Sequence, residues 1–139
     1  MPITNYGSRL VVQAVIGQAL TTPDTLYIAL TTASPNATST GVSLAEPAGG
    51  SYARAAILND AAHWTFDGYN LVYNTNDITF PTATGSWGRI GYWAICDALT
   101  NGNVLAYGTM NPVYSIVSGD TTKVLAGSCS FSVFAPESR

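Results

Sequence analysis

Residues 78–107, ITFPTATGSWGRIGYWAICDALTNGNVLAY, carry the strongest structural signals in this chain. They are rich in β-branched and aromatic residues, which favour strands. The pair Asn101-Gly102 between two apolar runs predicts a β-hairpin, because both residue types tolerate the positive φ angles of a tight turn. The segment holds no histidine, lysine or glutamate. It therefore indicates a structural element and not a reactive centre.

Within this segment, residues 87–96 are apolar at both alternating sets of positions. A strand of this kind is buried on both faces, so we expect it at the centre of a sandwich or at an interface. Arg89 shares the alternation of Trp87 and Trp93, which predicts that its guanidinium stacks on an indole.

The rest of the chain contains further short runs of strand-forming residues separated by turn signals. A break is expected at Asn111-Pro112, and a bend near Gly127 within the last run. The pattern predicts an all-β fold, a jelly-roll-like β-sandwich of about eight strands that forms a single domain over residues 1–139. The other predicted strands cover residues 25–32, 52–58, 64–66, 70–74, 77–80, 103–110, 113–117 and 121–134.

Two segments stand outside this strand pattern. Residues 1–22 form an N-terminal helical segment, with a helix expected over residues 6–19. Its polar residues occupy every fourth position from Asn5 and so form one stripe on an otherwise apolar helix. The wide apolar surface of such a helix must be buried on the domain or on a neighbour. Residues 33–51 form a long loop, which we interpret as an exposed arm or contact loop, with a mobile connection as an equal alternative.

The composition favours association with other proteins. Charged residues make up only 9% of the chain, against roughly 25% in a typical soluble domain. A surface with so few charges promotes association, so we expect a homodimer or homotrimer, or a subunit of a larger assembly. The five Lys and Arg residues are scattered and the net charge is −3, which argues against nucleic acid as a partner. No apolar run approaches the roughly 20 residues of a bilayer span, so no membrane partner is expected.

The residues that usually carry chemistry do not form a recognisable catalytic set. The only histidine, His63, lies beside a turn, and five of the six Asp residues occupy apparent turns, where Asp bonds the local backbone. The spacing of His63, Cys96 and Cys129 does not match a zinc site. We interpret the two cysteines as buried free thiols, with a disulfide as the alternative. The sequence predicts no catalytic residue, no cofactor and no metal, and thus no enzyme.

The aromatic residues outside the core provide the candidate contact surface, since Tyr and Trp are enriched at interfaces. The turn-dense segment near residue 64, the long loop and the N-terminus are the segments most available to a partner. The predicted interface residues are Trp64, Tyr69, Tyr73, Glu46, Arg54, Ile3 and Tyr6.

Three segments resemble a known family in their order along the chain: YIALTTASP (27–35), EPAGGSYARAAI (46–57) and ITFPTATGSWGRIGYWAICDALTNGNVLAYG (78–108). The sequence resembles small tailed-phage virion proteins described as tail-fibre-like or as head decoration proteins. In size it is most similar to the capsid cement protein of the Bordetella podophage type.

The resemblance implies a sandwich subunit on the capsid surface of the virion, made in the host cytoplasm, that binds the major capsid protein and stabilises the shell by bridging its subunits. The alternative is a tail-fibre or receptor-binding module that recognises a host surface glycan or protein. Fibres are normally long and repetitive, and this sequence has no repeat, so the cement role is preferred at this point. A lectin-like or hydrolytic enzyme is the weakest alternative, because Glu and His are scarce.

Overall fold

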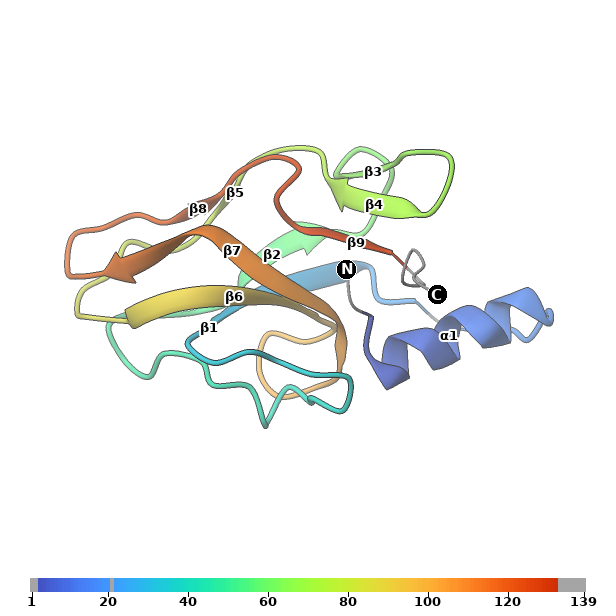
Figure 1. Ribbon diagram of the computed structural model, residues 1–139, viewed down its shortest axis with the longest axis horizontal. Helices are drawn as coiled ribbons and strands as arrows, with labels where there is room; N and C mark the ends of the chain where they lie inside the picture. The colour runs from blue at the N-terminus through green and yellow to red at the C-terminus, as the bar shows by residue number, and fades with distance from the viewer. Residues whose placement is uncertain (1–2, 21, 133–139) are drawn as a thin grey trace.

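The computed structural model describes residues 3–20 and 22–132 and confirms the predicted all-β class with a short N-terminal helix (Figure 1). The described elements are α1 (Asn5–Val15), β1 (Thr25–Thr31), β2 (Ala55–Leu58), β3 (Trp64–Phe66), β4 (Leu71–Asn74), β5 (Ile78–Thr79), β6 (Gly88–Cys96), β7 (Val104–Ile116), β8 (Lys123–Val124) and β9 (Ser130–Ser132).

The strands form two layers. The first layer is one antiparallel sheet in the order β2-β1-β6-β7. The second layer is divided between the sheet β3-β4-β9 and the pair β5-β8, which lie along the upper side in Figure 1. The main core lies between the layers and includes Ile28, Phe80, Trp93 and Val124. A regular jelly roll has two larger facing sheets, whereas here two small sheets face a single four-stranded one.

Strand β6 is central in its sheet, and its second half, from Trp93 to Cys96, is buried on both faces, as the sequence predicts. Trp93 and Ile95 belong to the main core on one side. Ala94 and Cys96 pack on the other side, where Leu44 of the long loop lies against them. The loop over residues 33–51 therefore does not extend as an arm. It folds back over the outer face of the sheet and shields it from water.

The prediction for Arg89 was wrong. Arg89 is exposed opposite Ser115, and the described cation–π contact joins Arg9 to the ring of Tyr6 instead, at 5.8 Å. The cause is a register shift in the β6–β7 ladder between Ile90 and Tyr92. At this shift four residues of β7 lie opposite the single residue Gly91, which interrupts the alternation of sides between Arg89 and Trp93.

The predicted break at Asn111-Pro112 was also wrong, because β7 continues through it. Residues 110–113 lie opposite Gly91 at the register shift, and β7 is the last strand of the sheet. An edge strand tolerates a proline, which has no N–H to donate to a neighbour.

The final predicted strand is divided into β8 and β9. Gly127 lies in the turn between them with a φ of 84°, which confirms the expected bend. Residues 133–134 of that predicted strand lie outside the described residues.

Candidate contact surfaces

Helix α1 is attached to the domain through its first turn. Thr4 caps the helix, and its buried side chain accepts a hydrogen bond from the Gly7 N–H at 3.1 Å. The same hydroxyl lies within hydrogen-bond distance of the Val104 and Leu105 carbonyls. The Thr4 N–H donates to the Leu105 carbonyl at 2.9 Å, which ties the backbone to the edge of β7.

Gly7 allows this close approach. A Cβ at this position would lie 2.5 Å from the Leu105 carbonyl oxygen and 2.7 Å from Ile3 Cγ1, so a side chain would push the turn away from β7. Ile3 is half-buried here and forms an antiparallel bridge with Ala106. Of the two N-terminal residues predicted as contacts, Ile3 is thus held at the sheet edge, and Tyr6 is half-buried beside Arg9.

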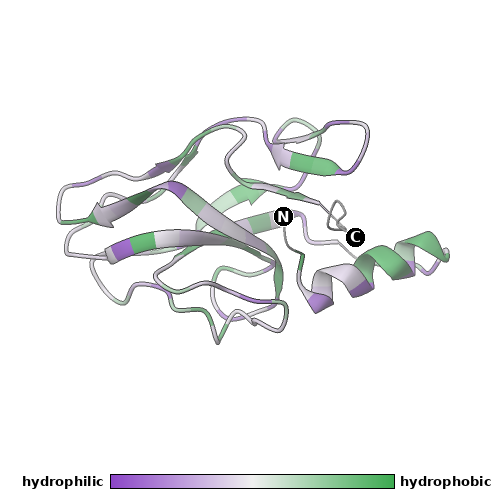
Figure 2. Cartoon of the chain, in the orientation of Figure 1, coloured by the Kyte–Doolittle hydropathy of each residue, from purple (hydrophilic) through white to green (hydrophobic). Residues whose placement is uncertain are grey.

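Beyond its first turn, α1 leaves the domain. Val12, Val15 and Ile16 are 59%, 79% and 65% exposed. Figure 1 shows the helix projecting from the sheets, and Figure 2 shows that its outer half is the hydrophobic half. The sequence predicts that this apolar surface is buried, and within the described residues most of it is uncovered.

A second projection is the hairpin between β3 and β4. One carboxylate oxygen of Asp67 accepts hydrogen bonds from the N–H groups of Tyr69 at 2.8 Å and of Asn70 and Leu71 at 3.1 Å. These bonds lower the pKa of the Asp67 carboxyl group and brace the turn. Tyr69 at its tip is 88% exposed, and the nearby Phe66 is 62% exposed. The turn therefore presents aromatic side chains from a braced backbone.

The other two aromatic residues predicted as contacts are partly packed. Trp64 meets Phe131 edge to face, with ring centroids 6.3 Å apart. Its indole Nε1 is buried, and no described residue accepts a hydrogen bond from it. Tyr73 is half-buried in the ladder between Thr65 and Ser130. Only Tyr69 of the three offers its whole side chain to a partner.

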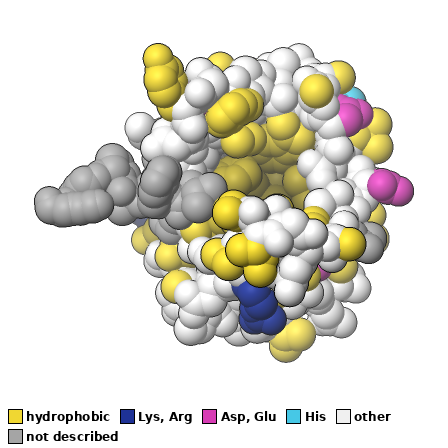
Figure 3. Space-filling view, turned by 90° about the vertical axis from the view of Figure 1, so that its right-hand side faces the viewer, with side chains coloured by type: hydrophobic (Ala, Val, Ile, Leu, Met, Phe, Trp, Pro, Cys, Tyr) yellow, Lys and Arg dark blue, Asp and Glu magenta, His cyan; other side chains and the backbone are white. Residues whose placement is uncertain are grey.

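The helix and the hairpin project from the same end of the molecule. Viewed from that end, hydrophobic side chains line and surround a hollow, and few charged groups are visible (Figure 3). We call this surface the helix end and define it by Val12 and Val15 of α1 and its C-cap residue Ile16, together with Phe66 and Tyr69 of the hairpin. The exposed residues of α1 and Phe66 were not among the predicted contacts, although the apolar surface of the helix is readable in the sequence.

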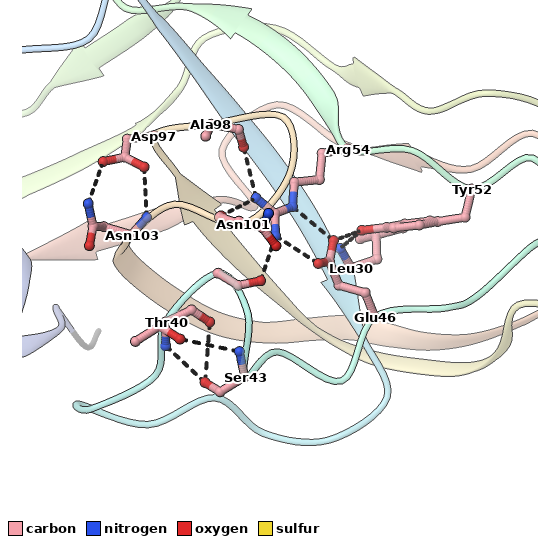
Figure 4. A network of polar contacts seen from close by, with 11 residues as sticks. Leu30, Thr40, Ser43, Glu46, Tyr52, Arg54, Asp97, Ala98, Asn101 and Asn103 are labelled. Carbon is pink, nitrogen blue, oxygen red and sulfur yellow. Dashed lines mark hydrogen bonds and ion pairs between the residues drawn. The ribbon is translucent and has the colours of Figure 1, made fainter.

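The remaining two predicted residues, Glu46 and Arg54, form a clasp between loops (Figure 4). The Arg54 side chain is 2% exposed. Its Nε and Nη2 donate to the two carboxylate oxygens of Glu46 at 2.9 and 2.8 Å. Its other N–H groups donate to the carbonyls of Gly41 at 3.0 Å, Ala98 at 2.8 Å and Asn101 at 3.0 Å. All five guanidinium donors are therefore used inside the chain.

Tyr52 completes the clasp. Its hydroxyl donates to Glu46 at 2.6 Å and accepts from the Leu30 N–H at 3.0 Å. Burial, followed by the hydrogen bond to the Glu46 carboxylate, raises the pKa of Tyr52 far above its usual value. Burial disfavours the charge of Arg54, but its hydrogen bonds to Glu46 and the electrostatic attraction of the neighbouring groups together raise its pKa. We expect Glu46 and Arg54 to shape the neighbouring loops, since their charged groups are already paired.

A groove of about 420 Å³ lies beside the clasp, between the loop over residues 33–51 and the β6–β7 turn. Val42 and Leu99 are exposed on its two sides, and Leu44 and Pro47 contribute to its lining. The sequence predicts a contact loop over residues 33–51 but did not single out these apolar residues, because the surrounding Gly, Ser and Thr residues give no periodicity from which burial could be read.

The groups capable of chemistry lie apart from one another. His63 Nδ1 lies 2.6 Å from an Asp60 oxygen at an exposed turn, and this hydrogen bond is the main cause of the lowered pKa of Asp60. Cys96 and Cys129 are buried free thiols. Among residues 3–20 and 22–132, no three His, Cys, Asp or Glu side chains are grouped to hold a metal ion. In the same ranges, no helix has the length and apolar character needed to cross a bilayer.

Comparison with known proteins identifies the family. No curated protein matches this chain. Residues 2–132 match the family described as Podophage GP4 fiber I protein gp80, so the match spans all the described strands. It agrees with the resemblance of the three sequence segments to phage virion proteins. The chain therefore belongs to the podophage GP4 fiber I protein gp80 family of phage structural proteins.

Proposed function

We propose that this protein is a fibre subunit of a podophage virion and that it acts by binding other proteins. The observation that carries the proposal is the helix end, where apolar side chains are exposed on α1 and on the β3–β4 hairpin. Thr4 fixes the first turn of α1, and Asp67 braces the hairpin turn. Exposed apolar surface of this kind marks contact sites in soluble proteins. The family description, which names a fibre protein, supports the fibre role.

The proposal assigns the protein no enzymatic role. Its single histidine is hydrogen-bonded to Asp60, and within the described part of the chain no hydroxyl or thiol is hydrogen-bonded to that imidazole as a nucleophile would be. Burial raises the pKa of Cys96 to about 12, so this thiol is a poor nucleophile at neutral pH. The partners in this proposal are further copies of the chain, other virion proteins and a host surface glycan or protein.

The second candidate is the capsid cement role, in which the protein binds the major capsid protein and bridges its subunits. It is favoured by the short, sheet-rich build of the described residues, which include no elongated stalk. The exposed Val42 and Leu99 beside the clasp would provide the contact with the shell. A protein that binds only the assembled shell raises the free energy of opening it.

Copy number and location in the virion distinguish the two candidates. Quantitative mass spectrometry of purified particles would compare this protein with the major capsid protein, and immunogold labelling would locate it. A few copies at the tail support the fibre role. A copy number close to that of the major capsid protein, with label over the whole head, supports cement. Absence from purified virions would refute both.

A further inference from the structure

We infer that the exposed face of α1 is a self-association surface, on which Val12, Val15 and Ile16 of one subunit pack against the same face of a second copy. This inference deepens the proposed function, because it names the surface through which fibre subunits would join. It concerns the isolated protein as well, so it can be tested without the virion.

The orientation of this face is set by the fold. Residues spaced three and four apart share one side of a helix, which places Val12 with Val15 and Ile16. The first turn is held on β7 by the buried Thr4 and by the close contact of Gly7. The helix therefore directs its three exposed residues away from its own domain in a defined direction.

The helix also needs a partner for its own stability. It has 11 residues, and an isolated helix shorter than about 12–15 residues is marginal in water. Val12 and Val15 are β-branched, which lowers the helix propensity further. Only Gly7 of the helix is fully buried against the domain. Packing of the outer turns on a neighbour would provide the burial that the helix lacks.

The charge pattern favours a second copy as that neighbour. Residues 10–23 contain no charged residue. In a two-fold contact each residue meets the same surface of its copy, so any charge on the face would meet its like. A face of Val and Ile avoids that repulsion. A helix that lies on a lipid surface is usually rich in Lys and Arg along its polar side, whereas α1 has only Arg9.

The required contact area extends beyond the helix. A stable interface buries roughly 1,200–2,000 Å² in total, more than two turns of helix provide. The braced hairpin with Phe66 and Tyr69 lies at the same end of the molecule and supplies further apolar surface (Figure 3). The contact thus comprises the helix end, with α1 at its centre.

Sedimentation equilibrium of the full chain tests the inference. The wild type is expected to be a dimer at micromolar concentration, because a two-fold contact joins two copies. The double variant Val15→Ser/Ile16→Ser is expected to weaken association at least about tenfold, as loss of a central apolar contact does. The control Val117→Ser/Leu125→Ser removes two similarly exposed apolar side chains from other surface segments and is expected to leave association unchanged. Circular dichroism checks that each variant is folded.

A second measurement reads the contact directly. Val12→Cys places a thiol on the face, while Cys96 and Cys129 stay buried, so oxidation is expected to join two copies through residue 12. An oligomer that shows no such cross-link and tolerates the double variant would overturn the inference. A monomeric wild type at 100 µM would also overturn it, and its sedimentation with phosphatidylcholine–phosphatidylglycerol vesicles would indicate a lipid partner instead. Neither result would alter the fibre assignment, which depends on location in the virion.

Discussion

Replacing Arg54 with methionine should destabilise the protein strongly, although the site is polar. The variant keeps an unbranched side chain about as long as the aliphatic part of arginine but removes the guanidinium with its five N–H donors. It leaves the Glu46 carboxylate without its cation and three carbonyl oxygens without a donor. Removing one partner of a buried ion pair costs about 3–5 kcal/mol.

The lower end of that range is expected here. Glu46 is 19% exposed and keeps the hydrogen bond from Tyr52, so water and the phenol partly compensate for the lost guanidinium. A loss of about 3 kcal/mol corresponds to a fall of about 1.5 M in the urea midpoint, taking a slope of about 2 kcal/mol/M for a chain of this size.

Urea unfolding followed by tryptophan fluorescence measures this loss. The matched double variant Arg54→Met/Glu46→Leu separates pairing from burial, because replacing both charges removes the stranded carboxylate. It should recover much of the stability lost in Arg54→Met. A midpoint shift below about 0.5 M would refute the reasoning, and so would additivity of the two single substitutions within about 0.5 kcal/mol.

Three further predictions concern the clasp, the helix and the thiols. One of the eight tyrosines should resist ionisation in an absorbance titration at 295 nm, and Tyr52→Phe should remove that tyrosine without changing the others. Because the folded-state pKa of Tyr52 is raised, its contribution to stability is complete below pH ~10 and is lost as the pH rises above that value. Gly7→Ala should cost about 1–3 kcal/mol and speed tryptic cleavage after Arg9, whereas Gly91→Ala, whose Cβ would meet no atom within 4 Å, should do neither. Cys96 should not react with a thiol reagent at pH 8 until the protein is unfolded, because its pKa is raised to about 12; rapid labelling of the native protein would contradict this.

Local signals in the sequence predicted most of the secondary structure. Strand β3 has the predicted bounds, and β1 and β4 differ from the prediction by one residue. Asn101 and Gly102 both have positive φ, at 56° and 74°, as the hairpin signal required. These features depend on residues close together in the chain, so pattern and propensity are sufficient to find them.

The errors arose where distant segments meet. Arg89 was assigned to the wrong face because the register shift between β6 and β7 depends on how the two strands pair, which no local pattern records. Pro112 was taken as a break because its place on the edge strand was unknown. The loop over residues 33–51 has no periodic pattern, so its packing against the outer face of the sheet could not be predicted from the sequence either.

The sequence by itself determined the class of the protein: an all-β chain with one apolar helix and few charges, in a phage structural family. Tertiary structure alone decided the roles of its polar and apolar residues. Arg54 donates hydrogen bonds to carbonyls as many as 47 positions away in the chain, so its charged group is used inside the protein and not at a contact surface. The apolar character of α1 suggests burial, but in the folded chain Val12, Val15 and Ile16 are exposed. The first turn of α1 is hydrogen-bonded to the edge of β7, and this attachment directs the rest of the helix away from the domain. Burial and partner choice are properties of the packed chain, since both depend on contacts between residues that are far apart in sequence.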